Sequence, residues 1–173
     1  IERAFGIRTN VSVVAKARTV ADMAKLLEAG EDAAAACLVP LRTTGTKRPL
    51  FLVHCGGGHV LRYGNFVEAM PDHQPIYGFA APPLGRDLEK LDVEDLANMY
   101  IGEMQKVQPE GPYQIGGYSF GGLVAYEMAR LLVAKGEKVD LLALFERQHA
   151  QLQRAKLLHL RFHRRPGQGV LIR

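Results

Sequence analysis

Residues 115–122 read Ile-Gly-Gly-Tyr-Ser-Phe-Gly-Gly, and an apolar helical run, residues 123–134, follows them directly. Within this stretch Ser119 has Gly117 two positions before it and Gly121 two positions after it. This spacing at a strand-to-helix junction is the nucleophile-elbow pattern. In so tight a turn the serine backbone is strained, and a Cβ at either glycine would strike the neighbouring strand or helix. The stretch therefore predicts a serine hydroxyl raised above a sheet.

Short apolar runs alternate with helical patterns on both sides of this turn. We expect strands at 50–54, 75–79, 113–115 and 139–145, and helices at 61–70, 91–107 and from the elbow to about 135, before Gly136. Asp92 is the expected cap of the second helix, whose buried face is predicted to carry Leu96, Met99, Tyr100, Met104 and Val107. Apolar strands separated by helices predict an α/β fold with a mostly parallel sheet, of which about four strands are present.

The segment before residue 48 has a different pattern. Residues 1–30 predict two short helices, the second with Thr19 as N-cap and Gly30 as its stop. Residues 31–47 contain an alanine tract, Pro40 and several threonines without a periodic apolar pattern, and we expect a linker there. The sequence therefore predicts a boundary between a small helical unit and a larger α/β unit.

The composition indicates a globular chain. Of its 173 residues 47% are hydrophobic, which supports one sizeable core. The chain starts with Ile and shows no signal-like or long apolar segment, so we expect a cytoplasmic piece of a longer protein. Cys37, in the predicted linker, and Cys55, in a loop, are too few for a disulfide framework and are expected to be free thiols.

The net charge of +4 is unevenly distributed, because several arginines and lysines but no carboxylate side chains follow Glu146. A basic tail of this kind is compatible with nucleic acid or an anionic membrane. It lacks interleaved aromatic residues beyond Phe162, however, and basic helices are commonly solvated surfaces. We therefore expect neither a nucleic-acid partner nor a membrane partner.

Acyl transfer through a serine also needs two backbone N–H groups that stabilise the developing oxyanion. The first is expected from Phe120, directly after the nucleophile. The second is expected from the glycine-rich loop 55–58, with Gly56 as the first choice and Cys55 as the next. Such loops also hold phosphates, but the two common phosphate-binding glycine patterns are not present. The oxyanion interpretation is therefore favoured.

A catalytic serine in this arrangement is followed in the chain by an acid and then by a histidine. Glu146, at the end of the last predicted strand, is the candidate acid, and a solvated strand-end charge is the alternative. The histidines after it are His149, His159 and His163, which lie in the basic helical segment and are predicted to be surface residues. His54 and His59 border the oxyanion loop and are interpreted as structural or pocket-lining. The sequence thus predicts a nucleophile without an evident base.

Three motifs carry a family resemblance. The segments 49–54 (PLFLVH), 107–113 (VQPEGPY) and 117–129 (GYSFGG followed by AYEMA) resemble a type I thioesterase domain, the chain-releasing domain of nonribosomal peptide and polyketide synthases, over about residues 48–147. The resemblance implies an α/β-hydrolase fold that needs no cofactor of its own, with Ser119 as nucleophile and Phe120 and the Gly56 region as oxyanion donors. Glu146 stands where the family usually has Asp. The family's histidine lies further downstream, beyond a helical lid whose start residues 148–165 resemble, so the resemblance implies a truncated domain.

The start of the chain adds a second resemblance. Phe5-Gly6-Ile7 and residues 19–27 (TVADMAKLL) resemble the last third of an acyl or peptidyl carrier domain, whose phosphopantetheine arm sits on a serine upstream of this chain. Together the two resemblances imply a carrier remnant at 1–30, a linker at 31–47 and the first part of a thioesterase domain at 48–173. The implied substrate is a carrier-bound acyl or peptidyl thioester, delivered by upstream synthase domains of the same polypeptide and released by hydrolysis or cyclisation.

Two alternatives stay open at this point. The lack of an evident base favours a non-catalytic docking or interaction module. The same fold also serves stand-alone esterases, although the carrier-like start of the chain argues against that function.

Overall fold

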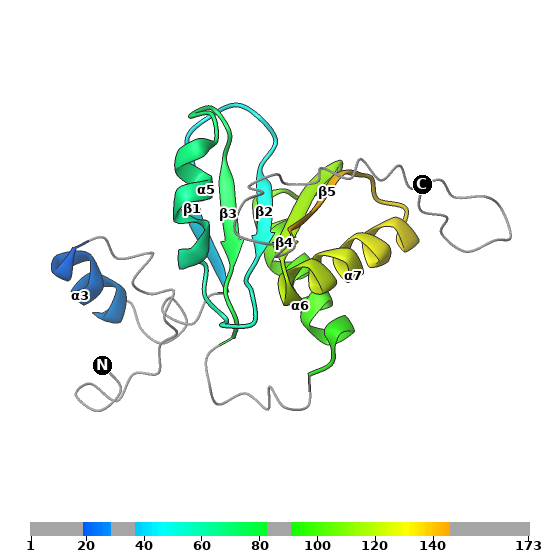
Figure 1. Cartoon of the computed structure of the whole chain (residues 1–173), viewed down its shortest axis with the longest axis horizontal. Helices are drawn as coiled ribbons and strands as arrows, with labels where there is room; N and C mark the ends of the chain where they lie inside the picture. The colour runs from blue at the N-terminus through cyan, green and yellow to red at the C-terminus, as the bar shows by residue number, and fades with distance from the viewer. Residues whose placement is uncertain (1–18, 29–36, 83–90, 146–173) are drawn as a thin grey trace, which may run out of the picture.

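The computed structural model of the chain describes residues 19–28, 37–82 and 91–145. Its sheet has five strands in the order β1-β3-β2-β4-β5 (Figure 1). The strands are β1 (Leu38–Arg42), β2 (Leu50–Val53), β3 (Ile76–Phe79), β4 (Tyr113–Tyr118) and β5 (Val139–Phe145). The neighbouring pairs among β2 to β5 are parallel, and β1 runs antiparallel to β3. The mostly parallel sheet and its four expected strands are confirmed.

The strand β1 is the main departure from the sequence-based prediction. It lies within residues 31–47, so the sheet has one strand more than expected, and the predicted linker is structured over part of its length. Pro40 pairs with Tyr77 at the edge of the sheet, a position that tolerates a residue without a backbone N–H. Cys37, expected in a linker, is 7% exposed and packs in the main core. The sequence did not predict this short strand, because the alanine tract before it and Pro40 within it leave no periodic apolar pattern.

The side chain of Arg42 joins β1 to the helix behind it. Its guanidinium donates to the carbonyl oxygens of Met70 (2.9 Å) and Pro71 (2.8 Å), and also to that of Val67. These carbonyls lie at the C-terminal end of α5 (Gly64–Ala69), where helical carbonyls lack intrahelical partners. A cation is favoured at this end of a helix, so Arg42 both satisfies the carbonyls and holds the edge strand in place.

The described helices agree with the expected ones. They are α3 (Val20–Glu28), a 3-10 turn η1 (Leu61–Tyr63) that leads into α5, α6 (Val93–Val107) and α7 (Phe120–Ala134). Both predicted caps are confirmed: the N–H of Asp22 donates to Thr19 Oγ1 (3.1 Å), and Asp92 forms a capping box with Asp95. Gly30 and the first helix expected in residues 1–30 lie outside the described residues. None of the described helices is long and apolar enough to cross a membrane.

Alternate residues of β2 point to opposite faces of the sheet, as the pleat requires. Phe51 and Val53 pack in the cluster formed with α6 and α7, whereas Leu50 and Leu52 pack with residues of η1 and α5. All four are buried. Helices therefore cover both faces, which is why the strand reads as a continuous apolar run.

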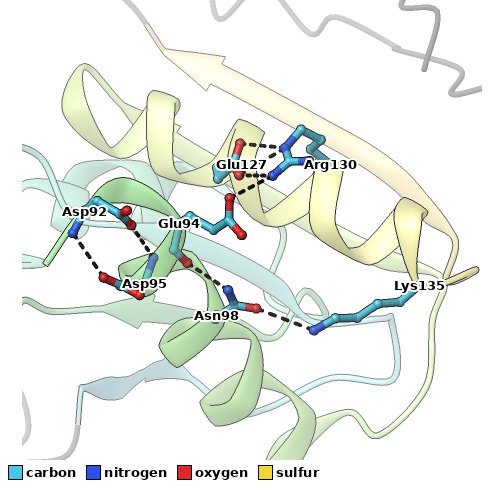
Figure 2. A network of polar contacts seen from close by, with 7 residues as sticks. All are labelled: Asp92, Glu94, Asp95, Asn98, Glu127, Arg130 and Lys135. Carbon is cyan, nitrogen blue, oxygen red and sulfur yellow. Dashed lines mark hydrogen bonds and ion pairs between the residues drawn. The ribbon is translucent and has the colours of Figure 1, made fainter. Parts of the chain in front are cut away.

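Polar side chains connect α6 and α7 on their outer surface, as Figure 2 shows. Arg130 of α7 forms ion pairs with Glu127 on its own helix (2.5 Å) and with Glu94 of α6 (3.2 Å). In contrast, Met104 of α6 is fully buried in the main core. Val107, which we expected on this buried face, is 39% exposed because it is the last residue of the helix.

Candidate active site

Ser119 joins the end of β4 to the start of α7 and has an unusual backbone conformation. Its φ of 55° and ψ of −119° make it the one non-glycine residue with positive φ among the described residues. Such a conformation costs roughly 1–3 kcal/mol and persists only where the surroundings hold it. The Ser119 N–H donates to the carbonyl oxygen of Phe145 in β5 (3.0 Å), and its carbonyl accepts from the Gly122 N–H (2.8 Å). The predicted strained elbow is confirmed.

The two glycines flanking Ser119 are required by close backbone contacts. A Cβ on Gly117 would overlap the carbonyl group of Gly121 at the start of α7. A Cβ on Gly121 would overlap the carbonyl oxygens of Val53 and His54 at the end of β2. The elbow therefore packs directly against the end of β2, and this contact brings the loop that follows β2 beside Ser119.

The predicted oxyanion donors lie on the two sides of this contact. Phe120 is the first residue of α7, and within the described residues its backbone N–H has no acceptor, as expected at a helix N-terminus. The positive end of the helix dipole also favours negative charge there. Gly56 is exposed in the adjacent loop, and a Cβ at this position would meet nothing within 4 Å. Among the described residues the Gly56 N–H also has no acceptor, so both N–H groups can bind a ligand.

His54 is the buried histidine at the end of β2, with 4% of its surface exposed. Its Nδ1 lies 2.6 Å from the carbonyl oxygen of Cys55, and its Nε2 lies 2.9 Å from the hydroxyl oxygen of Tyr100 on α6. Burial lowers the pKa of His54, with a smaller effect in the same direction from the neighbouring His59. The ring is therefore neutral at pH 7, and with both nitrogens engaged it is not available as a base for Ser119.

A pocket of about 370 Å³ opens beside the elbow. The pocket is lined by His54, Ala81, Pro82, Leu91, Asp92, Val93, Leu96 and Phe120. Apart from His54 and Asp92, these side chains are apolar, and the Asp92 carboxylate already accepts the N–H of Asp95 in the capping box. The prediction that His54 is structural or pocket-lining is confirmed. The residues present favour an apolar group beside Phe120, the residue after Ser119.

Sequence reasoning missed two tyrosines that support the site. The Tyr63 hydroxyl donates to the carbonyl oxygen of Val53 (2.5 Å) and accepts from the Tyr118 N–H (3.1 Å), so it bridges the ends of β2 and β4 directly before the elbow. Burial raises the pKa of Tyr63, which keeps the hydroxyl protonated. Tyr100 holds His54 from α6. Both are aromatic residues on helical segments and look like ordinary core residues, so the sequence carried no signal for these roles.

Two further residues lie close to the elbow or to the loop 55–58. The Arg62 guanidinium stands 4.2 Å from the centre of the Tyr118 ring, a cation–π contact directly before Ser119. His59, which follows the oxyanion loop, has a buried Nδ1 without a hydrogen-bond partner among the described residues. Within the described residues neither Cys37 nor Cys55 forms a disulfide bond, as expected.

The remaining candidates lie outside the described residues. These are Glu146, the predicted acid, and the downstream histidines His149, His159 and His163. Among the described residues no histidine nitrogen is hydrogen-bonded to the Ser119 hydroxyl. The described part of the chain thus supplies a candidate nucleophile, two candidate oxyanion donors and a pocket.

Comparison with known proteins identifies the family. A family model described as "Thioesterase domain" matches residues 48–163, which is more than half of the chain. The chain belongs to the thioesterase domain family. Among its curated relatives, a dimodular nonribosomal peptide synthase of Bacillus subtilis (strain 168) is 39% identical over 149 residues, which cover 84% of this chain and 6% of the relative. Malpibaldin synthetase of Mortierella alpina is 38% identical over 82% of this chain and 3% of its own length.

Solved structures of thioesterase domains have the same fold. A four-domain nonribosomal peptide synthetase, holo-AB3403 bound to AMP and glycine, matches 83% of this chain and 11% of its own length, with a TM-score of 0.64 and 30% identity. The NocB thioesterase domain, in a covalent complex with a fluorophosphonate nocardicin G analog, matches 62% of this chain and 48% of that domain, with a TM-score of 0.56 and 34% identity. The α/β-hydrolase-like fold of this thioesterase domain is therefore shown. The chain spans only a small part of the synthetases that it matches.

Proposed function

We propose that this chain is the part of a chain-releasing thioesterase that carries the nucleophile, Ser119. The observation that carries this proposal is the strained Ser119 backbone at the start of α7, with the N–H of Phe120 free beside it. Strain at one serine, supported by backbone contacts on both sides, is typical of a functional site. The proposed substrate is an acyl or peptidyl chain held as a pantetheine thioester on a carrier domain.

The proposed reaction has two steps. Ser119 Oγ attacks the thioester carbonyl carbon, its proton passes to a base, and the base returns a proton to the departing pantetheine sulfur, which leaves as a thiol. The acyl group remains as an ester on Oγ, while the N–H groups of Phe120 and Gly56 stabilise the oxyanion that forms on the way. Water, or a hydroxyl or amine of the chain itself, then attacks this ester, and its proton returns to Ser119 through the base. The product is a free acid or a ring.

The proposed acid is Glu146, which directly follows β5 (Val139–Phe145) in the sequence. The position supports this assignment, because the end of the strand after the elbow helix is where the acid of this fold stands. A glutamate can take the role of the more common aspartate if its longer side chain reaches the histidine. The proposed base is a histidine that lies outside the described residues, because both ring nitrogens of His54 are engaged.

The first residues of the chain are proposed to be the C-terminal part of the carrier domain, over residues 1–30. Two observations support this. The capped helix α3 has the start that the resemblance implies. The match to the Bacillus subtilis synthase covers 84% of the chain, which is more than the part from residue 48 onward, so it reaches into the preceding segment. Because β1 belongs to the sheet, the proposed linker ends before Leu38.

The proposal is tested with an acyl pantetheine thioester and a fluorophosphonate probe. The protein at its full natural length should release free thiol, and Ser119→Ala should lower kcat/KM at least about a thousandfold, as losing a nucleophile does in other serine hydrolases. Equal turnover by both forms would contradict the proposal. Simple esters, offered in parallel, separate a thioesterase from a general esterase.

The same probe decides between an enzyme and a docking module for the 173-residue chain. Rapid stoichiometric labelling that maps to Ser119 would show an activated serine and hence a base within this chain. Labelling no faster than that of the Ser119→Ala form would favour the non-catalytic module. The observation that supports this alternative is that no described histidine contacts the Ser119 hydroxyl.

A further inference from the structure

The peptide that joins Cys55 to Gly56 is held from one side by two hydrogen bonds. The carbonyl oxygen of Cys55 lies 2.6 Å from His54 Nδ1 and accepts the N–H of Gly58 at 2.9 Å. This carbonyl and the Gly56 N–H belong to one peptide unit, which is planar and trans, so the two groups point in opposite directions. Any group that fixes the carbonyl therefore also fixes the direction of the Gly56 N–H.

The His54 ring can hold this carbonyl only as a donor. A carbonyl oxygen accepts hydrogen bonds, so the proton of the neutral ring is on Nδ1 and Nε2 has a free lone pair. The Tyr100 hydroxyl lies 2.9 Å from Nε2 and 3.0 Å from the carbonyl oxygen of Ala80, so these two acceptors share its single proton. The ring is also packed between two aromatic rings, that of Tyr100 and that of Phe120, each with its centre 6.0 Å away. The Cys55 carbonyl thus selects the tautomer in which His54 donates to it, and the proton that Tyr100 shares with Nε2 supports the same tautomer.

Tyr100 itself is fixed by the core of the domain. It is fully buried on α6, and its ring stacks on Phe79 of β3 with the ring centres 4.6 Å apart. Its hydroxyl also donates to the carbonyl oxygen of Ala80 (3.0 Å), directly after β3, so the hydroxyl is held by the sheet as well as by His54. The Tyr100 side chain is thus held between α6 and β3, and the imidazole of His54 connects it to the loop 55–58.

We infer that Tyr100 and His54 are positioning residues that aim the Gly56 N–H at the oxyanion of the substrate. This inference rests on the proposed function and extends it to two residues that do not touch the reacting atoms. Tyr100 of α6 and His54, directly after β2, are 46 positions apart in the sequence. Their contact continues through the His54 ring to the peptide that carries the candidate donor. Pre-oriented donors are effective because they need no rearrangement as charge develops.

Kinetics of Tyr100→Phe test the inference in the protein at its full natural length. Loss of the hydroxyl should lower kcat about tenfold and leave KM within about twofold, as expected when only transition-state stabilisation is weakened. The matched control is Tyr113→Phe. Tyr113 is also fully buried, and its hydroxyl donates to a backbone carbonyl, that of Pro109 (3.1 Å), at the opposite end of β4 from Ser119. Equal kcat for the two variants would overturn the inference.

Variants of His54 separate positioning from packing. The side-chain amide of His54→Asn can still donate to the Cys55 carbonyl, whereas His54→Leu cannot. The leucine variant should lose up to about a hundredfold in kcat, the effect of losing an oxyanion donor, and asparagine should recover most of that loss. An asparagine variant as impaired as the leucine variant, with both folded, would show that the donor to Cys55 does not matter.

Nitrogen NMR of 15N-labelled histidine provides a readout that does not depend on activity. His54 should show the Nδ1-protonated tautomer in the wild type and in Tyr113→Phe, and an altered tautomer balance in Tyr100→Phe. A wild-type ring protonated on Nε2 would overturn the inference directly. Turnover that does not depend on Ser119 would overturn the proposed function, and the inference with it. Ser119-dependent turnover that is unchanged in Tyr100→Phe would overturn the inference alone.

Discussion

At the scale of single residues, the active site is determined by where a Cβ can and cannot be placed. Ser119 has a positive φ, a backbone conformation that disfavours any residue with a Cβ. Gly117 and Gly121 carry none, because the backbones of β4, α7 and the end of β2 meet at those positions. The local strain and the tight contacts are therefore parts of one arrangement that presents the serine.

This arrangement predicts opposite effects for two glycine substitutions. Gly121→Ala should lower the free energy of unfolding by roughly 1–3 kcal/mol or more, because the added methyl group overlaps the carbonyls of Val53 and His54. Gly102→Ala, at an exposed position of α6 with nothing within 4 Å of the new Cβ, should raise it by roughly 0.5–1 kcal/mol. Urea unfolding of both variants measures these changes. A neutral Gly121→Ala would contradict the contact at the elbow.

The buried imidazole of His54 predicts a pH-dependent stability. Its pKa in the folded chain lies below the value of 6.5 that it takes when unfolded, so the unfolded state binds the proton more readily. Its contribution is complete above pH 7 and is lost as the pH falls below 6.5, until the lowered pKa of the folded state is reached. The free energy of unfolding, measured from pH 8 to pH 5, should fall more steeply for the wild type than for His54→Asn. Parallel curves would show that His54 does not titrate differently in the two states.

At the scale of elements, α6 and α7 are held together by two kinds of contact of unequal strength. Met104 lies in the buried cluster between the helices, whereas Arg130 and its carboxylate partners lie on the outer surface (Figure 2). Exposed ion pairs are screened by water and salt, and buried apolar contacts are not. The apolar contact therefore contributes most of the stability, and the ion pairs add orientation.

A comparison of two truncations tests this order. Met104→Ala should lower the free energy of unfolding by roughly 2–5 kcal/mol, because it leaves a cavity in the main core. Arg130→Ala should lower the melting temperature far less than Met104→Ala does. The difference between Arg130→Ala and the wild type should vanish in concentrated sodium chloride. Thermal melts at low and high salt measure both effects. An Arg130→Ala loss as large as that of Met104→Ala would show that the ion pairs dominate.

At the scale of the whole molecule, β1 closes one edge of the sheet. It covers β3 through antiparallel pairing, buries Val39 completely and is anchored to the end of α5 by Arg42. An unpaired strand edge invites pairing with another chain. We therefore regard residues 37–42 as part of the domain, although the family model starts at residue 48.

A pair of shortened chains tests this boundary. A chain that begins at residue 37 should unfold at the same urea concentration as the whole chain. A chain that begins at residue 48 lacks β1, exposes the edge of β3, and should unfold at lower urea concentration and self-associate. Urea unfolding and sedimentation velocity measure the two effects. A stable, monomeric chain from residue 48 would show that β1 is dispensable.

The sequence-based prediction was most successful where the pattern is local. The elbow was predicted from Gly117, Ser119 and Gly121, which lie within five positions. Each parallel strand and each covering helix was predicted from the spacing of apolar residues within a short window. The prediction was wrong for residues 38–42, where Pro40 interrupts the apolar pattern. It was also wrong for Val107, because helical spacing cannot tell where the partner surface ends. The roles of Tyr63 and Tyr100 could not be predicted, since each joins segments distant in the sequence.

The amino-acid sequence by itself determined the fold class, the position of the strained turn at Ser119 and the family, because glycine spacing and apolar periodicity act over a few neighbouring residues. Only the tertiary structure decided that β1 completes the sheet, that His54 contacts Tyr100, and that the end of β2 lies against the elbow. The physical reason is that each of these contacts joins segments distant in the sequence, which meet only when the strands pair and the helices pack on the sheet.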